Sequence, residues 1–207
     1  LARYPHEGIG EFHIHNLDPA DRPLLTEIAR MAKERNIIIH IHSGAGPVRL
    51  LYEIEPNLTI LWAHAGMSEP PEVVGPMMDT YKTLYADTSY RENDILKGPI
   101  IDPFWLKVIL RHPDRFMVGS DTWVNSQWAD YEELIALNRA WLAKLPRDIA
   151  ERIDRGLVGQ VHERRRVAVH ETGHALISHH LPDADAATGI DLLDRKSRRS
   201  QSLCNAG

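Results

Sequence analysis

Five short apolar segments recur along the first three quarters of the chain, and they constrain its fold more than any other feature. They begin roughly every 25 residues, a spacing that suits repeated strand–helix units. The stretches between them place apolar residues three and four apart, as amphipathic helices do. Strands that alternate with helices predict parallel βαβ units in one sheet. The expected strands are Ile9–His15, Ile37–His42, Thr59–His64, Leu84–Ser89 and Arg115–Asp121.

The connecting segments contain helix-start signals. Asp102 followed by Pro103 is a capping residue with a proline in the first helical turn. Asp130 and Glu133 have the spacing of a capping box before another apolar stripe. In the third connector, Pro76 follows a glycine and interrupts the helical pattern.

The repeat fits two architectures, a (β/α) TIM-type barrel and a doubly wound open sheet. The sequence has no glycine-rich dinucleotide-binding motif after any of the expected strands, so the doubly wound sheet is the less favoured alternative. We therefore expect an α/β fold that is a partial (β/α) TIM-type barrel of about five βα units, followed by a helical appendage.

Alternate residues of a strand share a face, and in each expected strand one face is polar or ionisable. Buried ionisable groups need partners or a metal. The expected polar faces hold Glu11, His13 and His15; His40 and His42; Trp62 and His64; Tyr85, Asp87 and Ser89; and Met117, Gly119 and Asp121.

Three of these side chains stand at the carboxyl end of their strand. They are His42, His64 and Asp121. In a (β/α) barrel the functional groups gather at that end, and histidine is the commonest metal ligand. The sequence therefore predicts a convergent metal site formed by these three residues.

The strand sequences GIGEFHIH, IIIHIHSG, ILWAHAGM, LYADTSYREND and RFMVGSDTW resemble the amidohydrolase-related metal-dependent hydrolases, the branch with small decarboxylases and lactonases. The resemblance implies that the strands are the fourth to eighth of the barrel. It also implies a divalent metal, expected to be zinc, held by Glu11, His42, His64 and Asp121. By the family pattern, Asp121 takes a proton from a metal-polarised water, and His64 binds metal or shuttles protons.

Two alternatives remain open at this stage. His13 and His15 form a His-x-His pair, which would fit the first strand of such a barrel instead of the fourth. Arg91 is expected to bind a substrate carboxylate, because a guanidinium group matches a carboxylate bidentately. The alternative is that Arg91 is a solvated arginine in a loop.

The last quarter of the chain has a different character. His170, Glu171 and His174 form an H-E-x-x-H motif, in which two histidines one helical turn apart bind zinc and the glutamate acts as general base. The flanking residues resemble the zinc protease domain of ATP-dependent membrane proteases. We expect a helix from about residue 163 to 180.

The expected domains are a partial barrel over 1–153, a helical segment with the H-E-x-x-H motif over 154–193, and a polar tail over 194–207 that is expected to be disordered. The net charge of −5 argues against nucleic acid as a partner. The single cysteine, Cys204, rules out an internal disulfide and favours a cytoplasmic setting. We expect no membrane span, a small-molecule substrate and a homo-oligomer as a further possibility.

Three functions are thus open. The first is an amidohydrolase-type enzyme acting on a small carboxylate, lactone or amide, or decarboxylating its substrate. The second is a zinc metallopeptidase that uses Glu171. The third is a non-catalytic remnant or fusion fragment that only binds metal or another chain, because the first barrel strands are not recognisable.

Overall fold

The sheet of this computed structural model has five parallel strands in sequential order. The structure describes residues 7–122 and 125–161. Strand β1 pairs with β2, β2 with β3, β3 with β4, and β4 with β7. The strands are β1 (Gly8–Ile14), β2 (Ile38–Ser43), β3 (Ile60–Trp62), β4 (Leu84–Asp87) and β7 (Phe116–Met117).

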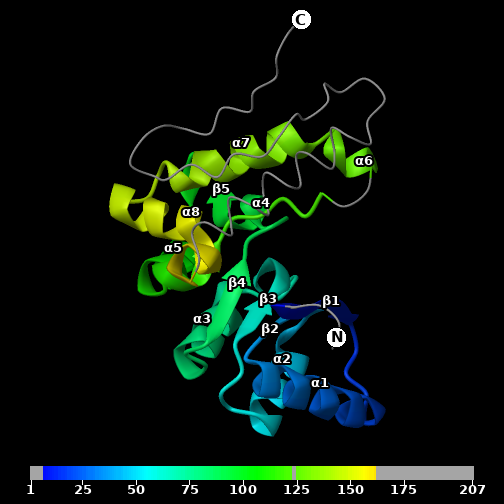
Figure 1. The fold of residues 1–207 in the computed structure, drawn as a ribbon. Helices are drawn as coiled ribbons and strands as arrows, with labels where there is room; N and C mark the ends of the chain where they lie inside the picture. The colour runs from blue at the N-terminus through cyan, green and yellow to red at the C-terminus, as the bar shows by residue number, and fades with distance from the viewer. Residues whose placement is uncertain (1–6, 123–124, 162–207) are drawn as a thin grey trace, which may run out of the picture. The chain divides into compact units, whose positions relative to one another are not determined.

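Helices follow the strands along the chain, as the sequence predicts. Helix α1 contacts α2, α2 contacts α3, and α3 contacts α5, so the connecting helices form a layer beside the sheet (Figure 1). The longer helices are α1 (Arg22–Arg35), α2 (Ala45–Ile54), α3 (Pro71–Thr80), α5 (Pro103–Arg111), α7 (Tyr131–Leu142) and α8 (Arg147–Val161).

Short elements complete the described chain. The strands β5 and β6 form a separate antiparallel pair between β4 and α5. The short elements are η1 (Pro19–Asp21), η2 (Ala63–Ala65), α4 (Glu92–Ile95), β5 (Leu96–Lys97), β6 (Ile100–Ile101), η3 (Pro113–Arg115) and α6 (Asn125–Trp128).

One face of the sheet is mainly apolar and is buried from β2 to β7. Cross-strand register places Ile39 opposite Ile60, and Ile60 opposite Leu84, so large aliphatic side chains form a continuous row. Helices pack on this row with their own apolar stripes, as in α1, where Leu25 and Ile28 are buried. Burying such side chains contributes about 1.5–3 kcal/mol each. The fold therefore has its core between this face and the helices, and the other face is left for polar groups.

The start of α5 confirms the predicted cap, because the Asp102 carboxylate accepts hydrogen bonds from the backbone of Phe104 and Trp105. The capping box predicted at α7 is wrong: within the described chain, Asp130 makes no side-chain cap hydrogen bond. Helix α3 runs on through Pro76.

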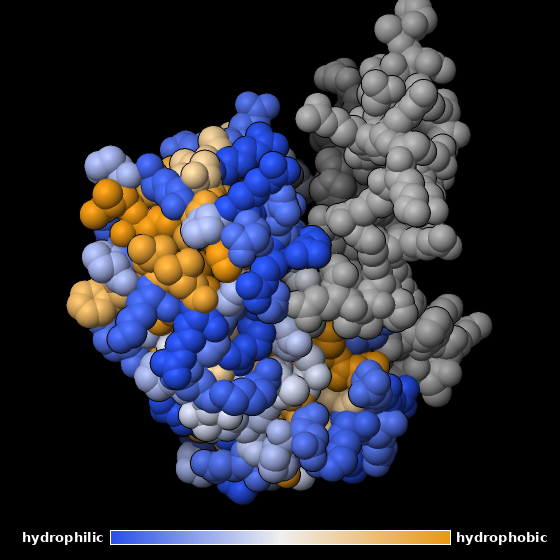
Figure 2. Space-filling view, turned by 90° about the vertical axis from the view of Figure 1, so that its left-hand side faces the viewer, coloured by the Kyte–Doolittle hydropathy of each residue, from blue (hydrophilic) through white to orange (hydrophobic). Residues whose placement is uncertain are grey.

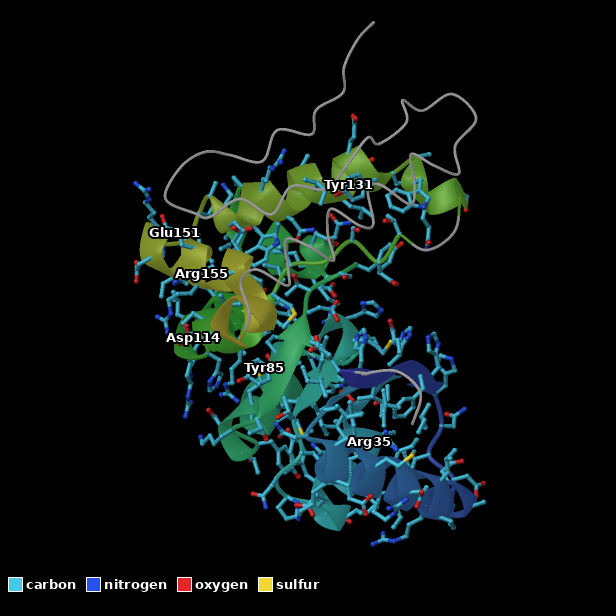
Figure 3. All side chains as sticks on the ribbon, viewed as in Figure 1. Arg35, Tyr85, Asp114, Tyr131, Glu151 and Arg155 are labelled. Atoms are coloured by element: carbon cyan, nitrogen blue, oxygen red, sulfur yellow. The ribbon has the colours of Figure 1, made fainter. Side chains whose placement is uncertain are left out.

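The predicted α/β class and parallel sheet are confirmed, but a closed barrel is not seen in the described residues, where β1 and β7 are the two edges of the sheet. Contacts divide the chain into Leu1–Gly156 and Leu157–Gly207. In the first unit, Asp114, which precedes β7 and is labelled in Figure 3, pairs with Arg152 of α8.

The surface on the side where α3, α5 and α8 lie in Figure 1 is mostly hydrophilic, with a larger apolar area at the upper left and a smaller one beside the grey atoms (Figure 2). Among the residues that the structure describes, none of the helices has the length and apolar character needed to cross a membrane.

Candidate metal centre

The polar face of β1 and β2 brings ionisable side chains together near one end of the sheet. His13 lies opposite His42 in the parallel register, and their ring nitrogens, Nε2 and Nδ1, are 3.1 Å apart. Glu11 is two residues before His13 and shares its face, and its Oε1 lies 3.0 Å from His42 Nδ1. Strand alternation thus positions these three side chains as the sequence predicts.

A bulge in β1 adjusts where Glu11 points. The register with β2 shifts between Ile9 and Phe12, so β1 has one residue more than its partner there. Gly10 occupies this bulge with φ +134°, and a Cβ at this position would lie 2.1 Å from His40 O. Only glycine fits this close approach of the two strands.

His64 reaches the site by a left-handed turn and not from a strand. Strand β3 ends at Trp62, whose side chain is buried on the apolar face and whose indole N–H donates to Ser43 O. His64, Ala65 and Gly66 then have φ angles of 53°, 46° and 85°. The prediction that Trp62 and His64 share a face is wrong, because this turn brings His64 round to the polar side.

Asp121 likewise lies beyond its strand, because β7 covers only Phe116 and Met117 instead of the longer strand predicted. Its φ of 47° is also left-handed. The carboxylate Oδ2 is 3.6 Å from His64 Nε2, and His64 Nε2 is 4.0 Å from Glu11 Oε1. The four metal ligands expected from the sequence, Glu11, His42, His64 and Asp121, are therefore brought into one cluster.

Asp87 is a member of the site that the sequence analysis left without a role. This buried carboxylate, at the end of β4, accepts a hydrogen bond from the backbone N–H of His64 at 3.1 Å, and its Oδ1 is 3.3 Å from His64 Nδ1. Burial opposes its charge, but contacts with His40 and His64 outweigh this and lower the pKa of Asp87. Its place on the polar face, two residues from Tyr85, was the available signal (Tyr85 is labelled on β4 in Figure 3).

The cluster shifts the titration of its members in different directions. Burial, followed by the nearby His13 and His64, lowers the pKa of His42. Burial by itself would lower the pKa of His64 as well. Its contact with Asp87 and the charges of the nearby carboxylates outweigh burial, and the pKa of His64 is raised. Burial is the main cause of the raised pKa of Asp121. A neutral His42 is in the form that binds a metal.

Arg91 has a structural role that differs from the predicted substrate contact. It is 4% exposed, and its Nε, Nη1 and Nη2 donate to Asp94 Oδ2, His64 O and Glu69 O respectively. Its guanidinium group also lies 4.8 Å from the centre of the Trp105 ring. In the structure these donors hold the turn that carries His64, and substrate binding by Arg91 stays a prediction.

A family model described as Amidohydrolase matches residues 11–156, which is more than half of the chain. The chain belongs to the amidohydrolase family. The family supports metal-dependent hydrolysis as the general chemistry and does not identify the substrate.

This amidohydrolase-family chain is also similar to a curated protein, the ATP-dependent zinc metalloprotease FtsH 3 of Sphaerobacter thermophilus. The two are 37% identical over 70 residues, which is 30% of this chain and 14% of the relative. The chain thus spans about a seventh of the length of that relative. No solved structure matches the chain. The predicted ligands His170 and His174, the predicted base Glu171 and the helix expected around them lie outside the described residues.

The residues of the amidohydrolase site fit a divalent metal. Imidazole nitrogens and carboxylate oxygens are ligands of zinc and similar ions. The Nδ1 atom of His42 lies 3.0 Å from Glu11 Oε1 and 3.1 Å from His13 Nε2, so three possible ligand atoms face one another. Histidine nitrogens and a carboxylate that converge in this way are typical of a site that holds an ion. Within the described chain, Glu11, His13 and His42 form the group whose ligand atoms lie close enough to share one.

Proposed function

We propose that this chain is a metal-dependent hydrolase of the amidohydrolase type, acting on a small carboxylate, lactone or amide, with decarboxylation at the same site as a variant of its chemistry. The convergence of Glu11, His42, His64 and Asp121 at one cluster is the observation that carries the proposal. Family membership supports it, and it implies that the five parallel strands are the fourth to eighth of a (β/α) barrel.

Each residue has a proposed role. A divalent metal bound in the cluster would polarise the substrate and lower the pKa of a bound water. Asp121 is the proposed proton acceptor, and its raised pKa brings its basicity closer to that of a base working near neutral pH. His64, which lies between Asp87 and Asp121, is the proposed carrier of that proton to the leaving group.

The test replaces Asp121 with asparagine in the metal-loaded chain and measures turnover of a panel of small lactones, amides and carboxylates. Loss of proton acceptance should reduce kcat by about 100-fold or more while the circular dichroism spectrum is unchanged. Asp148→Asn, at an exposed position in the first turn of α8, is the matched control and should keep wild-type turnover. Full activity in Asp121→Asn would remove Asp121 from the mechanism.

A second candidate function is zinc-dependent peptide hydrolysis at His170, Glu171 and His174. The H-E-x-x-H spacing and the similarity to a zinc metalloprotease favour it. Cleavage of a casein-type substrate that is lost in Glu171→Gln but kept in Asp121→Asn would support the peptidase. Cleavage kept in Glu171→Gln would contradict a peptidase that uses this residue.

A further inference from the structure

We propose that the divalent metal binds in a triangle formed by Glu11 Oε1, His13 Nε2 and His42 Nδ1, so that His13 is a metal ligand and His64 and Asp121 stand beside the ion. The inference rests on the proposed metal-dependent function and specifies which residues hold the ion. The sequence analysis left a metal role for His13 open and did not include it among the four expected ligands.

The geometry of these three atoms matches that of a metal complex. The distances are 3.0 Å from Glu11 Oε1 to His42 Nδ1, 3.1 Å from His42 Nδ1 to His13 Nε2, and 3.8 Å from His13 Nε2 to Glu11 Oε1. In a tetrahedral site with bonds of about 2.0–2.1 Å, neighbouring ligand atoms lie about 3.3–3.4 Å apart. A point about 2 Å from all three atoms therefore exists without any movement of the side chains.

His64 fits the same position less well. Its Nε2 is 4.0 Å from the shared Glu11 oxygen and closer, at 3.6 Å, to Asp121 Oδ2. Its other ring nitrogen lies 3.3 Å from Asp87 Oδ1, on a different side of the cluster. The structure thus keeps His64 between two carboxylates, which suits proton transfer better than ligation.

The three atoms of the triangle all carry lone pairs that point toward one another's neighbourhood, and a positive charge between them would offset their repulsion. A carboxylate only accepts hydrogen bonds, and a neutral imidazole has one donor and one acceptor nitrogen. A proton on His42 Nδ1 has two acceptors within 3.1 Å and must be shared between them. A cation at the centre of the triangle satisfies all three atoms at once.

The two strands hold the triangle in place. His13 and His42 are register partners in a parallel pair, and the bulge at Gly10 aims Glu11 at the same point. Ligands on paired strands are fixed more accurately than ligands on loops. The His13 side chain is 51% exposed, so an ion held there would be accessible to a water or a substrate.

The experiment titrates the full chain with Zn²⁺ by calorimetry and with Co²⁺ by visible absorption. His13→Ala should weaken Zn²⁺ binding by roughly 100-fold and abolish the strong colour of four-coordinate Co²⁺. His15→Ala is the matched control, because His15 is the next residue on the same face and its ring centre is 6.0 Å from that of His42. It should change the affinity by less than about threefold.

Each variant is also measured in a His174→Ala background, because the H-E-x-x-H motif offers other zinc ligands. Equal affinities in His13→Ala and His15→Ala would overturn the proposed ligand. If His64→Ala and Asp121→Asn instead lost the metal, the ion would lie on their side of the cluster, and the proposed hydrolase would stand without this inference. A wild-type chain that bound no Zn²⁺ in this background would overturn both.

Discussion

Removing the Arg91 guanidinium group should destabilise the protein more than any exposed arginine can. In Arg91→Met, the carbonyls of His64, Ala65 and Glu69 lose a buried donor, and Asp94 loses one of its two charged partners. Three carbonyls at about 1 kcal/mol each, with a small addition for the half-exposed Asp94, give a loss of about 3–4 kcal/mol. For a chain of this size that corresponds to a fall in Tm of roughly 6–16 °C.

Urea unfolding followed by circular dichroism measures the loss as a shift of the midpoint at constant m-value. The matched control is Arg111→Met. The Arg111 side chain is 60% exposed and forms an ion pair with Asp79. It should cost less than about 1 kcal/mol. Arg91→Lys should recover less than half of the loss, because one ammonium group cannot reach all of the acceptors. If Arg91→Met were as stable as Arg111→Met, the account of this buried network would be refuted.

Three further predictions concern a turn, a buried acid and the metal. Gly66→Ala should lower the free energy of unfolding, measured in urea, by at least about 2 kcal/mol more than Gly98→Ala does. Both glycines have positive φ, but only at Gly66 would a Cβ meet the Trp62 ring, at 2.3 Å. Equal losses in the two variants would contradict this reason. Burial raises the pKa of Glu92, although its carboxylate accepts a hydrogen bond from Asn138. The native state therefore binds the Glu92 proton more tightly than the unfolded state does. As a result, the stability of the wild type falls as pH rises from about 4.5 through the raised pKa. The stability of Glu92→Gln relative to wild type should therefore increase across that window, and parallel pH curves would contradict the prediction. Zn²⁺ at 100 times its Kd should stabilise the chain by about 2.7 kcal/mol and raise Tm by roughly 5–10 °C, an effect that a chelator should reverse.

The regular part of the fold could be predicted from the sequence because it depends on local patterns. Two-residue alternation in β1 and β2 correctly placed Glu11, His13 and His42 on one face. The cap at Asp102 was predictable for the same reason, since its partners are two and three residues away.

The rest depends on contacts between residues far apart in the chain. His64 was expected on a strand, but its left-handed turn is held by Asp87 and by Arg91, both more than 20 residues away. The same distance explains why the backbone contacts of Arg91 were not predicted: a sequence pattern does not reveal which carbonyls will surround a guanidinium group. The capping-box spacing before α7 failed at Asp130, because the φ of −96° and ψ of −2° at this residue are helical and a capping residue needs an extended backbone.

The bulged pair of β1 and β2 also has a consequence for how the protein folds. Glu11, His13 and His42 are separated in the chain only by α1 and its connections, whereas Asp121 joins them from the far end of the sheet. Because the entropy cost of closing a loop grows with its length, the three β1–β2 groups meet at a lower cost than any set that includes Asp121. The first βαβ unit is therefore the part of the chain where an ion can be captured earliest during folding, and Asp121 is added when the last strand docks.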